Sequence, residues 1–160
     1  MIVKDIIDVG FQDYYKPYTF IATAVCDWKC CREQGVDISI CQNCEIAKQK
    51  GIDISIKKIY KMYINNPISK AIVIGGLEPF LQYEDIFSLI KYFRKHGCKD
   101  DIVIYTGYYL DEIETQINNL KKFDNIIIKE GRFLLNSEQK FDEVLKVNLN
   151  SKNQRGIKIS

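Results

Sequence analysis

The sequence has no long hydrophobic segment, no large excess of charge of either sign, and only one histidine. Its 160 residues include 23 Lys and Arg against 21 Asp and Glu, so the formal net charge is only +2. This balance gives no electrostatic reason to expect a nucleic acid or a membrane surface as a partner. No apolar run reaches the roughly 18 residues of a membrane-spanning helix, and residues 1–5 do not begin a signal peptide. We therefore expect a cytoplasmic protein.

The composition is that of an ordinary globular domain. Hydrophobic residues make up 46% of the chain and charged residues 28%, which argues against disorder and against a coiled coil. A chain of this length buries enough surface to fold without disulfide bonds or a structural metal. We therefore expect residues 1–160 to form a single domain.

Cysteine is the residue type whose distribution is unusual. Five of the six cysteines lie between positions 26 and 44, and Cys98 stands apart. In a reducing compartment, clustered thiols hold a metal or carry out redox chemistry more often than they form disulfides. An iron–sulfur cluster, a zinc ion, and inert or regulatory thiols are the three interpretations of this group. Its members are Cys26, Cys30, Cys31, Cys41 and Cys44.

Short apolar segments alternate with helix-like segments along most of the chain. A polar region without periodicity, residues 26–50, follows the first strongly apolar segment and carries the clustered cysteines. We expect this region to be a loop organised by its cysteines. Such alternation predicts right-handed βαβ units, and hence an α/β fold with a mostly parallel sheet. The expected strands are 18–25, 71–74, 102–105 and 125–129, with a leading strand or edge segment within 1–17; the expected helices follow Ser55 and span the regions around 86–93 and 113–120.

Each expected central strand is followed by a turn that contains glycine. The first of these turns is Gly75-Gly76-Leu77-Glu78-Pro79. Two glycines let a ligand approach the backbone closely, and Glu78 is an acceptor suited to an ammonium group. Ligands of parallel α/β sheets bind at the carboxyl ends of the strands. Because the cysteine-rich region also follows a strand, we expect it to share one edge of the sheet with these turns.

Five segments, taken in order, resemble the motifs of radical S-adenosylmethionine (SAM) enzymes. The resemblance is to the activating proteins of anaerobic ribonucleoside-triphosphate reductase, and it covers about residues 18–159. It implies a partial (βα) barrel of about six strands that binds a 4Fe–4S cluster and SAM. The five segments are Cys26–Cys30, Ile74–Phe80, Tyr105–Tyr108, Ile128–Phe133 and Ser151–Arg155.

The resemblance also implies which cysteines hold the cluster. Cys26 and Cys30 have the spacing of the family's first two ligands, but Glu33 stands where the third is usual. Cys41 is followed by Gln42-Asn43, which is similar to the family's sequence after its third cysteine. The implied ligands are therefore Cys26, Cys30 and Cys41, with residues 32–40 as an insertion. Cys31 in place of Cys30, and a register that uses Cys44, remain alternatives.

The remaining implications concern SAM and the reaction. By resemblance, Gly75, Gly76, Glu78 and Pro79 orient the methionine end of SAM, and Thr106-Gly107 matches a further motif at the site. One electron then cleaves SAM to a 5′-deoxyadenosyl radical, which generates a glycyl radical on an anaerobic ribonucleotide reductase. An electron donor such as flavodoxin or ferredoxin is expected. The alternatives are a radical SAM enzyme for another protein or a small molecule, for example of the deazaguanine type, and a zinc-stabilised adaptor without activity.

Overall fold

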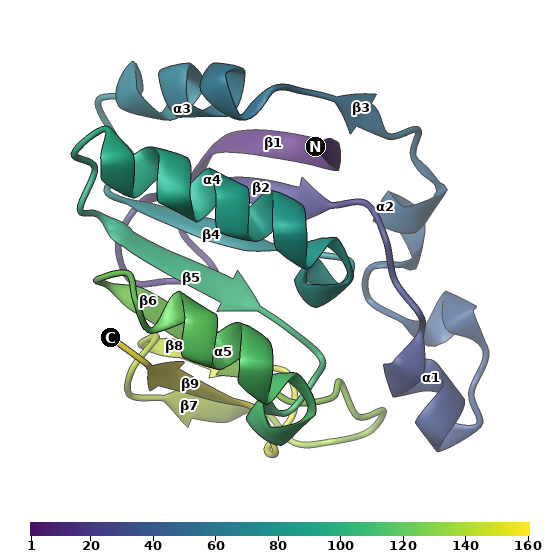
Figure 1. Ribbon diagram of the computed structural model, residues 1–160. Helices are drawn as coiled ribbons and strands as arrows, with labels where there is room; N and C mark the ends of the chain where they lie inside the picture. The colour runs from purple at the N-terminus through teal and green to yellow at the C-terminus, as the bar shows by residue number, and fades with distance from the viewer.

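A computed structural model describes all residues, 1–160, and contains a seven-stranded sheet with the order β3–β1–β2–β4–β5–β6–β9 (Figure 1). Strands β2, β4, β5 and β6 are parallel neighbours, whereas β1, β3 and β9 pair antiparallel at the two sides. The strands are β1 (Ile2–Gly10), β2 (Tyr18–Thr23), β3 (Ile52–Asp53), β4 (Ala71–Gly76), β5 (Asp101–Tyr105), β6 (Ile126–Glu130) and β9 (Arg155–Lys158). A separate hairpin pairs β7 (Lys140–Asp142) with β8 (Val147–Leu149).

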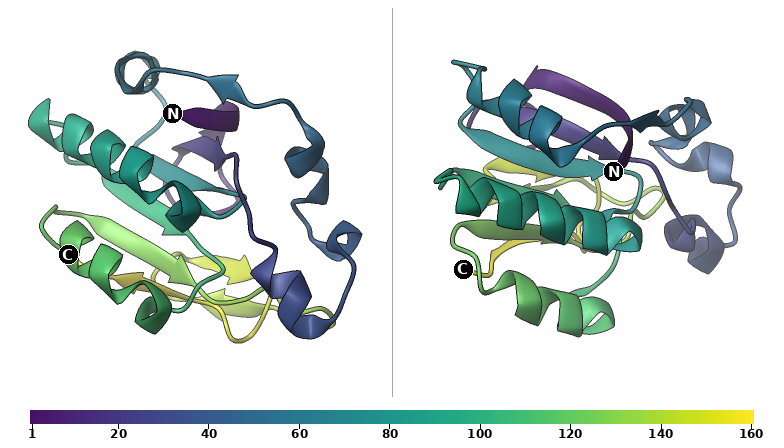
Figure 2. Two further views of the ribbon diagram at one scale, coloured as in Figure 1. Left: turned by 45° about the vertical axis from the view of Figure 1, so that its right-hand side comes forward. Right: turned by 45° about the horizontal axis from the view of Figure 1, so that its top comes forward.

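Three helices cover one face of the sheet, as the views in Figures 1 and 2 show. They are α3 (Ile56–Ile64), α4 (Tyr83–Lys95) and α5 (Glu114–Leu120); the short 3₁₀ helices η2 (Pro79–Gln82) and η3 (Leu110–Ile113) precede the last two. The side chain of Ser55 accepts a hydrogen bond from the backbone N–H of Lys58 and so caps α3. None of the helices is long and apolar enough to cross a membrane.

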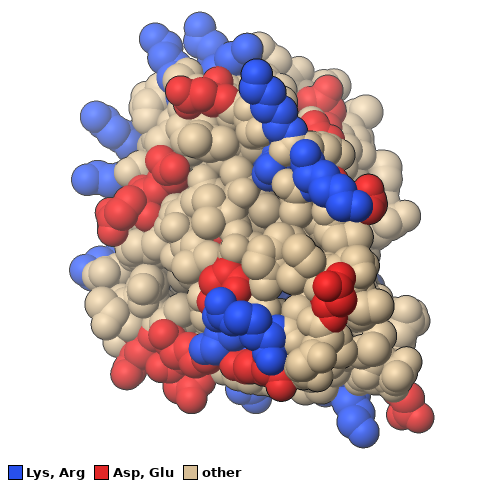
Figure 3. All heavy atoms as spheres, turned by 90° about the vertical axis from the view of Figure 1, so that its right-hand side faces the viewer, with Lys and Arg blue, Asp and Glu red and all other residues tan.

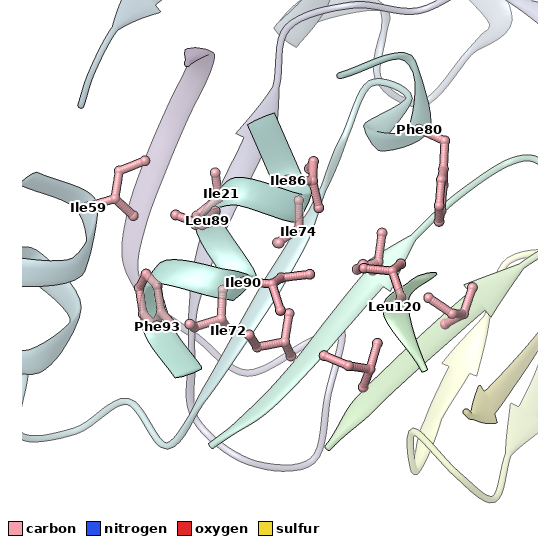
Figure 4. Packing of buried hydrophobic residues seen from close by; sticks show 14 of the residues in the cluster. Ile21, Ile59, Ile72, Ile74, Phe80, Ile86, Leu89, Ile90, Phe93 and Leu120 are labelled. Carbon is pink, nitrogen blue, oxygen red and sulfur yellow. The ribbon is translucent and has the colours of Figure 1, made fainter. Parts of the chain in front are cut away.

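The alternation of side chains along the central strands builds two cores. On β4, Ile72 and Ile74 point to the helices and pack with Leu89 and Phe93 of α4 in the larger core (Figure 4). Val73, between them in sequence, faces the opposite side and joins the smaller core. Other members of the smaller core are Tyr14, Tyr18, Ala71, Val103, Ile127, Leu145 and Leu149.

The expected α/β class and its parallel strands are confirmed, with two corrections. The sheet has seven strands rather than about six, because short antiparallel strands extend it on both sides. The cysteine-rich region is not a simple loop, since it contains α1 (Lys29–Gln34), η1 (Ile38–Ile40) and α2 (Cys44–Lys48). Left-handed backbone at Trp28 and Gly35, with φ of 58° and 63°, bounds α1. Helices this short show no clear hydrophobic period, and the sequence pattern therefore did not reveal them.

Candidate functional site

A cavity lies at the carboxyl ends of the parallel strands, between the cysteine-rich segment and the β7–β8 hairpin. Residues from segments far apart in the chain line it, including Cys26, Cys30, Cys31, Cys41, Gly76, Glu78, Thr106, Gly107, Lys129 and Asn150. In Figure 1 the strands point toward the segment that carries α1 and α2, which extends along this edge of the sheet. The edge expected from the glycine turns is thus the place where thiols and turns meet.

The sulfur atoms of three cysteines receive backbone hydrogen bonds or lie near backbone donors. The N–H of Trp28 donates to Sγ of Cys26 over 3.2 Å, and the N–H of Asn43 donates to Sγ of Cys41 over 3.4 Å. A hydrogen bond from the backbone of Phe133 lowers the pKa of Cys30, although burial raises it more. Hydrogen bonds of this kind stabilise the thiolate form, and they are one of the features that tune a metal-bound sulfur.

Burial opposes ionisation of these thiols in the metal-free protein. Desolvation raises the pKa of Cys26 to about 12, and the nearby carboxyl groups of Glu78 and Asp27 act in the same direction. For Cys30, the positive charges of Arg132 and Lys129 partly offset the effect of burial on the pKa. A metal centre must therefore displace protons from these sulfurs when it binds.

The remaining cysteines have different surroundings. Cys31 also lines the cavity, where burial, followed by the neighbouring Cys41 and Cys30 thiols, raises its pKa. Cys44 lies outside the cavity, and its Sγ faces the Glu45 carboxylate at 3.6 Å. Cys98 is buried in the larger core, away from the other five. The cavity thus contains four thiols, of which Cys26, Cys30 and Cys41 are the three implied by the resemblance.

Glu78 is the centre of the glycine turn and is almost completely buried, with 5% of its surface exposed. Its Oε1 accepts hydrogen bonds from Oγ1 of Thr106 at 2.7 Å and from the N–H of Phe80 at 3.0 Å. Its Oε2 accepts the N–H of Gly107 at 2.9 Å. Burial raises the pKa of Glu78 in spite of these donors. A carboxylate has about four acceptor positions, so one on Oε2 remains for a ligand in the cavity.

The glycines and Pro79 shape the turn around that carboxylate. Gly76 has a φ of +82°, and a Cβ atom there would lie 3.0 Å from the backbone of Ala22. Gly75 has similar limits, because a Cβ would lie 3.2 to 3.3 Å from Tyr105 and Phe20. Pro79 begins η2. The diglycine is therefore required by close packing of neighbouring strands as well as by any ligand.

Two side-chain amides connect the Cys41 region to the rest of the cavity. Nδ2 of Asn43 donates to the carbonyl oxygen of Gly76 at 2.5 Å, and Nδ2 of Asn150 donates to Oε1 of Gln42 at 2.6 Å. The first bond joins the residues after Cys41 to the glycine turn, and the second joins them to the end of the hairpin. These contacts bring Cys41 back to the cavity after the insertion at 32–40.

The donor set fits an iron–sulfur cluster better than a single metal ion. No three His, Cys, Asp or Glu side chains are arranged to hold one ion. A structural zinc ion needs four ligands around one point, whereas each thiolate of a 4Fe–4S cluster binds a different iron. The four thiols that line the cavity are not gathered around one point, and this arrangement suits the cluster better than a single zinc ion.

Comparison with known families agrees with this donor set. The family described as "4Fe-4S single cluster domain" matches residues 24–157. The chain belongs to this family. Domains of the family are typical of radical SAM enzymes, which include activating enzymes for glycyl radicals. The expectation of a 4Fe–4S domain of radical SAM type is thus confirmed. Among curated proteins, none matched the chain.

The structure also reveals a site residue that the sequence analysis missed. Lys129 lines the cavity from the end of β6 and is only 6% exposed. Its Nζ donates to the carbonyl oxygen of Gly131 at 3.3 Å and lies 5.6 Å from the centre of the Tyr105 ring. Burial lowers the pKa of Lys129 to about 8. A lysine at the end of the apolar run NIIIK was the available signal.

Proposed function

We propose that the protein is a radical SAM activating enzyme that forms a glycyl radical on an anaerobic ribonucleotide reductase. The observation that carries the proposal is the convergence of Cys26, Cys30 and Cys41 on one cavity with the Glu78 turn, in a chain of the 4Fe–4S single cluster family. When bound, the cluster supplies one electron that cleaves SAM to methionine and a 5′-deoxyadenosyl radical. The protein supplies orientation and excludes competing reactions.

Each group of residues has a defined part in this proposal. The thiols of Cys26, Cys30 and Cys41 would hold the cluster, which would supply an open iron for SAM. The remaining acceptor position of Glu78 would accept a hydrogen bond from the SAM ammonium group. Gly76 and Gly107 line the cavity with backbone atoms that no side chain of their own covers, which lets a ligand approach the backbone closely. Thr106 keeps the Glu78 carboxylate in place through its 2.7 Å hydrogen bond.

The surface above the cysteine-rich segment supports a macromolecular substrate. Figure 3 views the protein from that side; uncharged atoms occupy much of the centre, with acidic and basic side chains mainly around it. Ile38 and Ile40 of η1 are exposed there by 49% and 43%. Exposed isoleucines close together in one turn offer an apolar contact for a protein partner. We infer that the reductase, and an electron donor such as flavodoxin or ferredoxin, bind on this side of the protein.

Anaerobic reconstitution tests the proposal directly. The purified chain is loaded with iron and sulfide, reduced, and mixed with SAM; we expect about four irons for each chain and release of 5′-deoxyadenosine. Addition of an anaerobic ribonucleotide reductase should then give a glycyl-radical signal in electron paramagnetic resonance (EPR). SAM cleavage without that signal would support a different substrate. One tightly bound zinc without SAM cleavage would support the adaptor and refute the enzyme.

Single substitutions test the cysteine register. Alanine at Cys26, Cys30 or Cys41 should abolish cluster binding, because each removes one of three ligands. Alanine at Cys44 is the matched control, since its sulfur lies outside the cavity. Iron and sulfide analysis measures the outcome. Loss of the cluster in Cys44→Ala with retention in Cys30→Ala would show that the ligands are assigned to the wrong register.

A further inference from the structure

Arg132 connects the helix that carries Cys30 to the turn after β5. Its side chain is only 4% exposed. Nε donates to Oε2 of Glu33 at 2.8 Å, and Nη2 donates to Oε1 of the same carboxylate at 3.1 Å. Nη2 also donates to Oε1 of Glu112 at 2.7 Å, and Nη1 donates to the carbonyl oxygen of Gly107. One guanidinium group thus contacts three separate segments of the chain.

Gly107 is held on three sides by groups of the site. Its N–H donates to Oε2 of Glu78 at 2.9 Å, and its carbonyl oxygen accepts from Arg132. A Cβ atom on Gly107 would lie 2.9 Å from Sγ of Cys30, so that sulfur lies directly against the glycine. The Gly107 carbonyl shares its peptide group with the N–H of Tyr108, and a donor on that carbonyl makes this N–H a stronger hydrogen-bond donor. The N–H of Tyr108 donates to Oγ1 of Thr106 at 3.0 Å, and Thr106 in turn donates to Glu78. Arg132 is therefore linked to Glu78 through Gly107 and its two neighbours, and to Cys30 through the contact of its sulfur with Gly107.

The short helix α1 needs such an external contact. It has only six residues, and its N-cap residue, Trp28, makes no capping hydrogen bond with its side chain, although Asp27 accepts the N–H of Lys29 at 3.1 Å. A helix of this length is not stable alone. Nε2 of Gln34 donates to the carbonyl oxygen of Phe133 at 2.8 Å, and its Oε1 accepts the N–H of Leu135 at 2.9 Å. These bonds are between neutral groups, whereas Glu33 makes a charged contact from α1 to Arg132. Burying a guanidinium group is costly unless it is fully paired, and here two carboxylates and a carbonyl pair it.

We propose that Arg132, together with Glu33, is a positioning residue that couples the Cys30 side of the cluster site to the Glu78 side. The guanidinium group holds α1 against Gly107, so that the sulfur of Cys30 and the carboxylate of Glu78 keep a common geometry. The residue touches neither reacting atoms nor ligand. The consequence for binding rests on the proposed function, because it concerns how SAM binds beside the cluster.

Arg132→Gln and Glu33→Gln test the coupling in the reconstituted protein. We expect both variants to retain the cluster, with iron contents close to that of the wild type, but to bind SAM at least tenfold more weakly. Their reduced clusters should require correspondingly more SAM before the EPR spectrum changes. Arg132→Lys keeps the positive charge but loses the planar guanidinium group with its several donors, so it should recover only part of the SAM affinity.

Lys16→Gln is the matched control. Lys16 pairs with Asp101 through Nζ at 2.5 Å, at the amino end of β5 and therefore at the opposite end of that strand from the cavity. The control should bind SAM as the wild type does. Equal SAM affinity in Arg132→Gln, Glu33→Gln and Lys16→Gln would refute the coupling, as would loss of affinity only in proportion to a lowered unfolding temperature.

Hydrogen exchange of the metal-free protein separates this inference from the proposed function. In Arg132→Gln and Glu33→Gln, amides of residues 29–35 and 106–108 should exchange at least tenfold faster than in the wild type, whereas those of β4 should not change. If the wild-type protein fails to bind SAM, the proposed function is wrong, and the exchange data alone decide whether Arg132 joins the two segments. Unchanged exchange in both segments would overturn the inference.

Discussion

Replacing Lys129 with methionine should stabilise the protein near neutral pH. Lys129 is 6% exposed, and burial lowers its pKa from 10.5 to about 8. At about 1.4 kcal/mol for each pH unit, that change corresponds to about 3 kcal/mol of unfavourable burial of the charged form. Methionine has a similar length and no charge, so Lys129→Met should raise the free energy of unfolding at pH 7 by up to about 3 kcal/mol. The loss of the single hydrogen bond to Gly131 reduces this gain.

The pH dependence identifies the charge as the cause. The unfolded chain binds a proton at this lysine up to pH 10.5, whereas the folded protein releases it near pH 8. Between these values the unfolded state holds more protons, so this lysine makes the wild type more stable as pH rises through that window. The advantage of Lys129→Met should therefore shrink steadily from pH 8 and be nearly absent near pH 10.5.

Urea unfolding of the metal-free protein under reducing, anaerobic conditions measures this difference at several pH values. The same pair of proteins is also compared in a Cys30→Ser background, because the positive charge of Lys129 lowers the pKa of Cys30 and its removal changes that thiol as well. Lys158→Met is the matched control, because Lys158 is exposed on β9 opposite Ile127 of β6; it should show little effect at any pH. A stability difference for Lys129→Met that stays constant from pH 7 to pH 10.5 would falsify the burial argument.

Three further substitutions test the glycine turn, the larger core and a helix cap by denaturant unfolding. Gly76→Ala should destabilise the protein by about 2 kcal/mol or more, because its φ of +82° disfavours a side chain and a Cβ would lie 3.0 Å from Ala22. Gly97 has the same φ and no atom within 4 Å of the added Cβ, so Gly97→Ala measures the cost of the backbone conformation without the steric contact. Leu89→Ala should cost about 2–5 kcal/mol, because the side chain is fully buried between α4 and the sheet. Ser55→Ala should cost about 1 kcal/mol through loss of the α3 cap; equal stability of variant and wild type at any of these positions would contradict the corresponding contact.

The alternation of strands and helices was predictable because it rests on local signals. Runs such as AIVI and IVIY have one hydrophobic pattern, and each is followed by glycine at the turn. The structure places β4 at Ala71–Gly76 and β5 at Asp101–Tyr105, as these runs predict. The edge of the sheet that carries the site follows from the same signals, since parallel strands end on one side. The cysteine spacing alone left an iron–sulfur cluster, zinc and inert or regulatory thiols open, and the four-iron cluster was implied by the resemblance of five segments to radical SAM enzymes.

The tertiary structure alone determined the contacts between segments that lie far apart in the chain. The fold brings Cys41 to the cavity, where Asn43 contacts Gly76, whereas Cys44 does not line it. The choice of Cys41 as the third ligand stays a prediction. The ion pair of Glu33 with Arg132 joins residues 99 positions apart. Local composition does not encode such partners, because a side chain's charge and burial depend on what the folded chain places beside it.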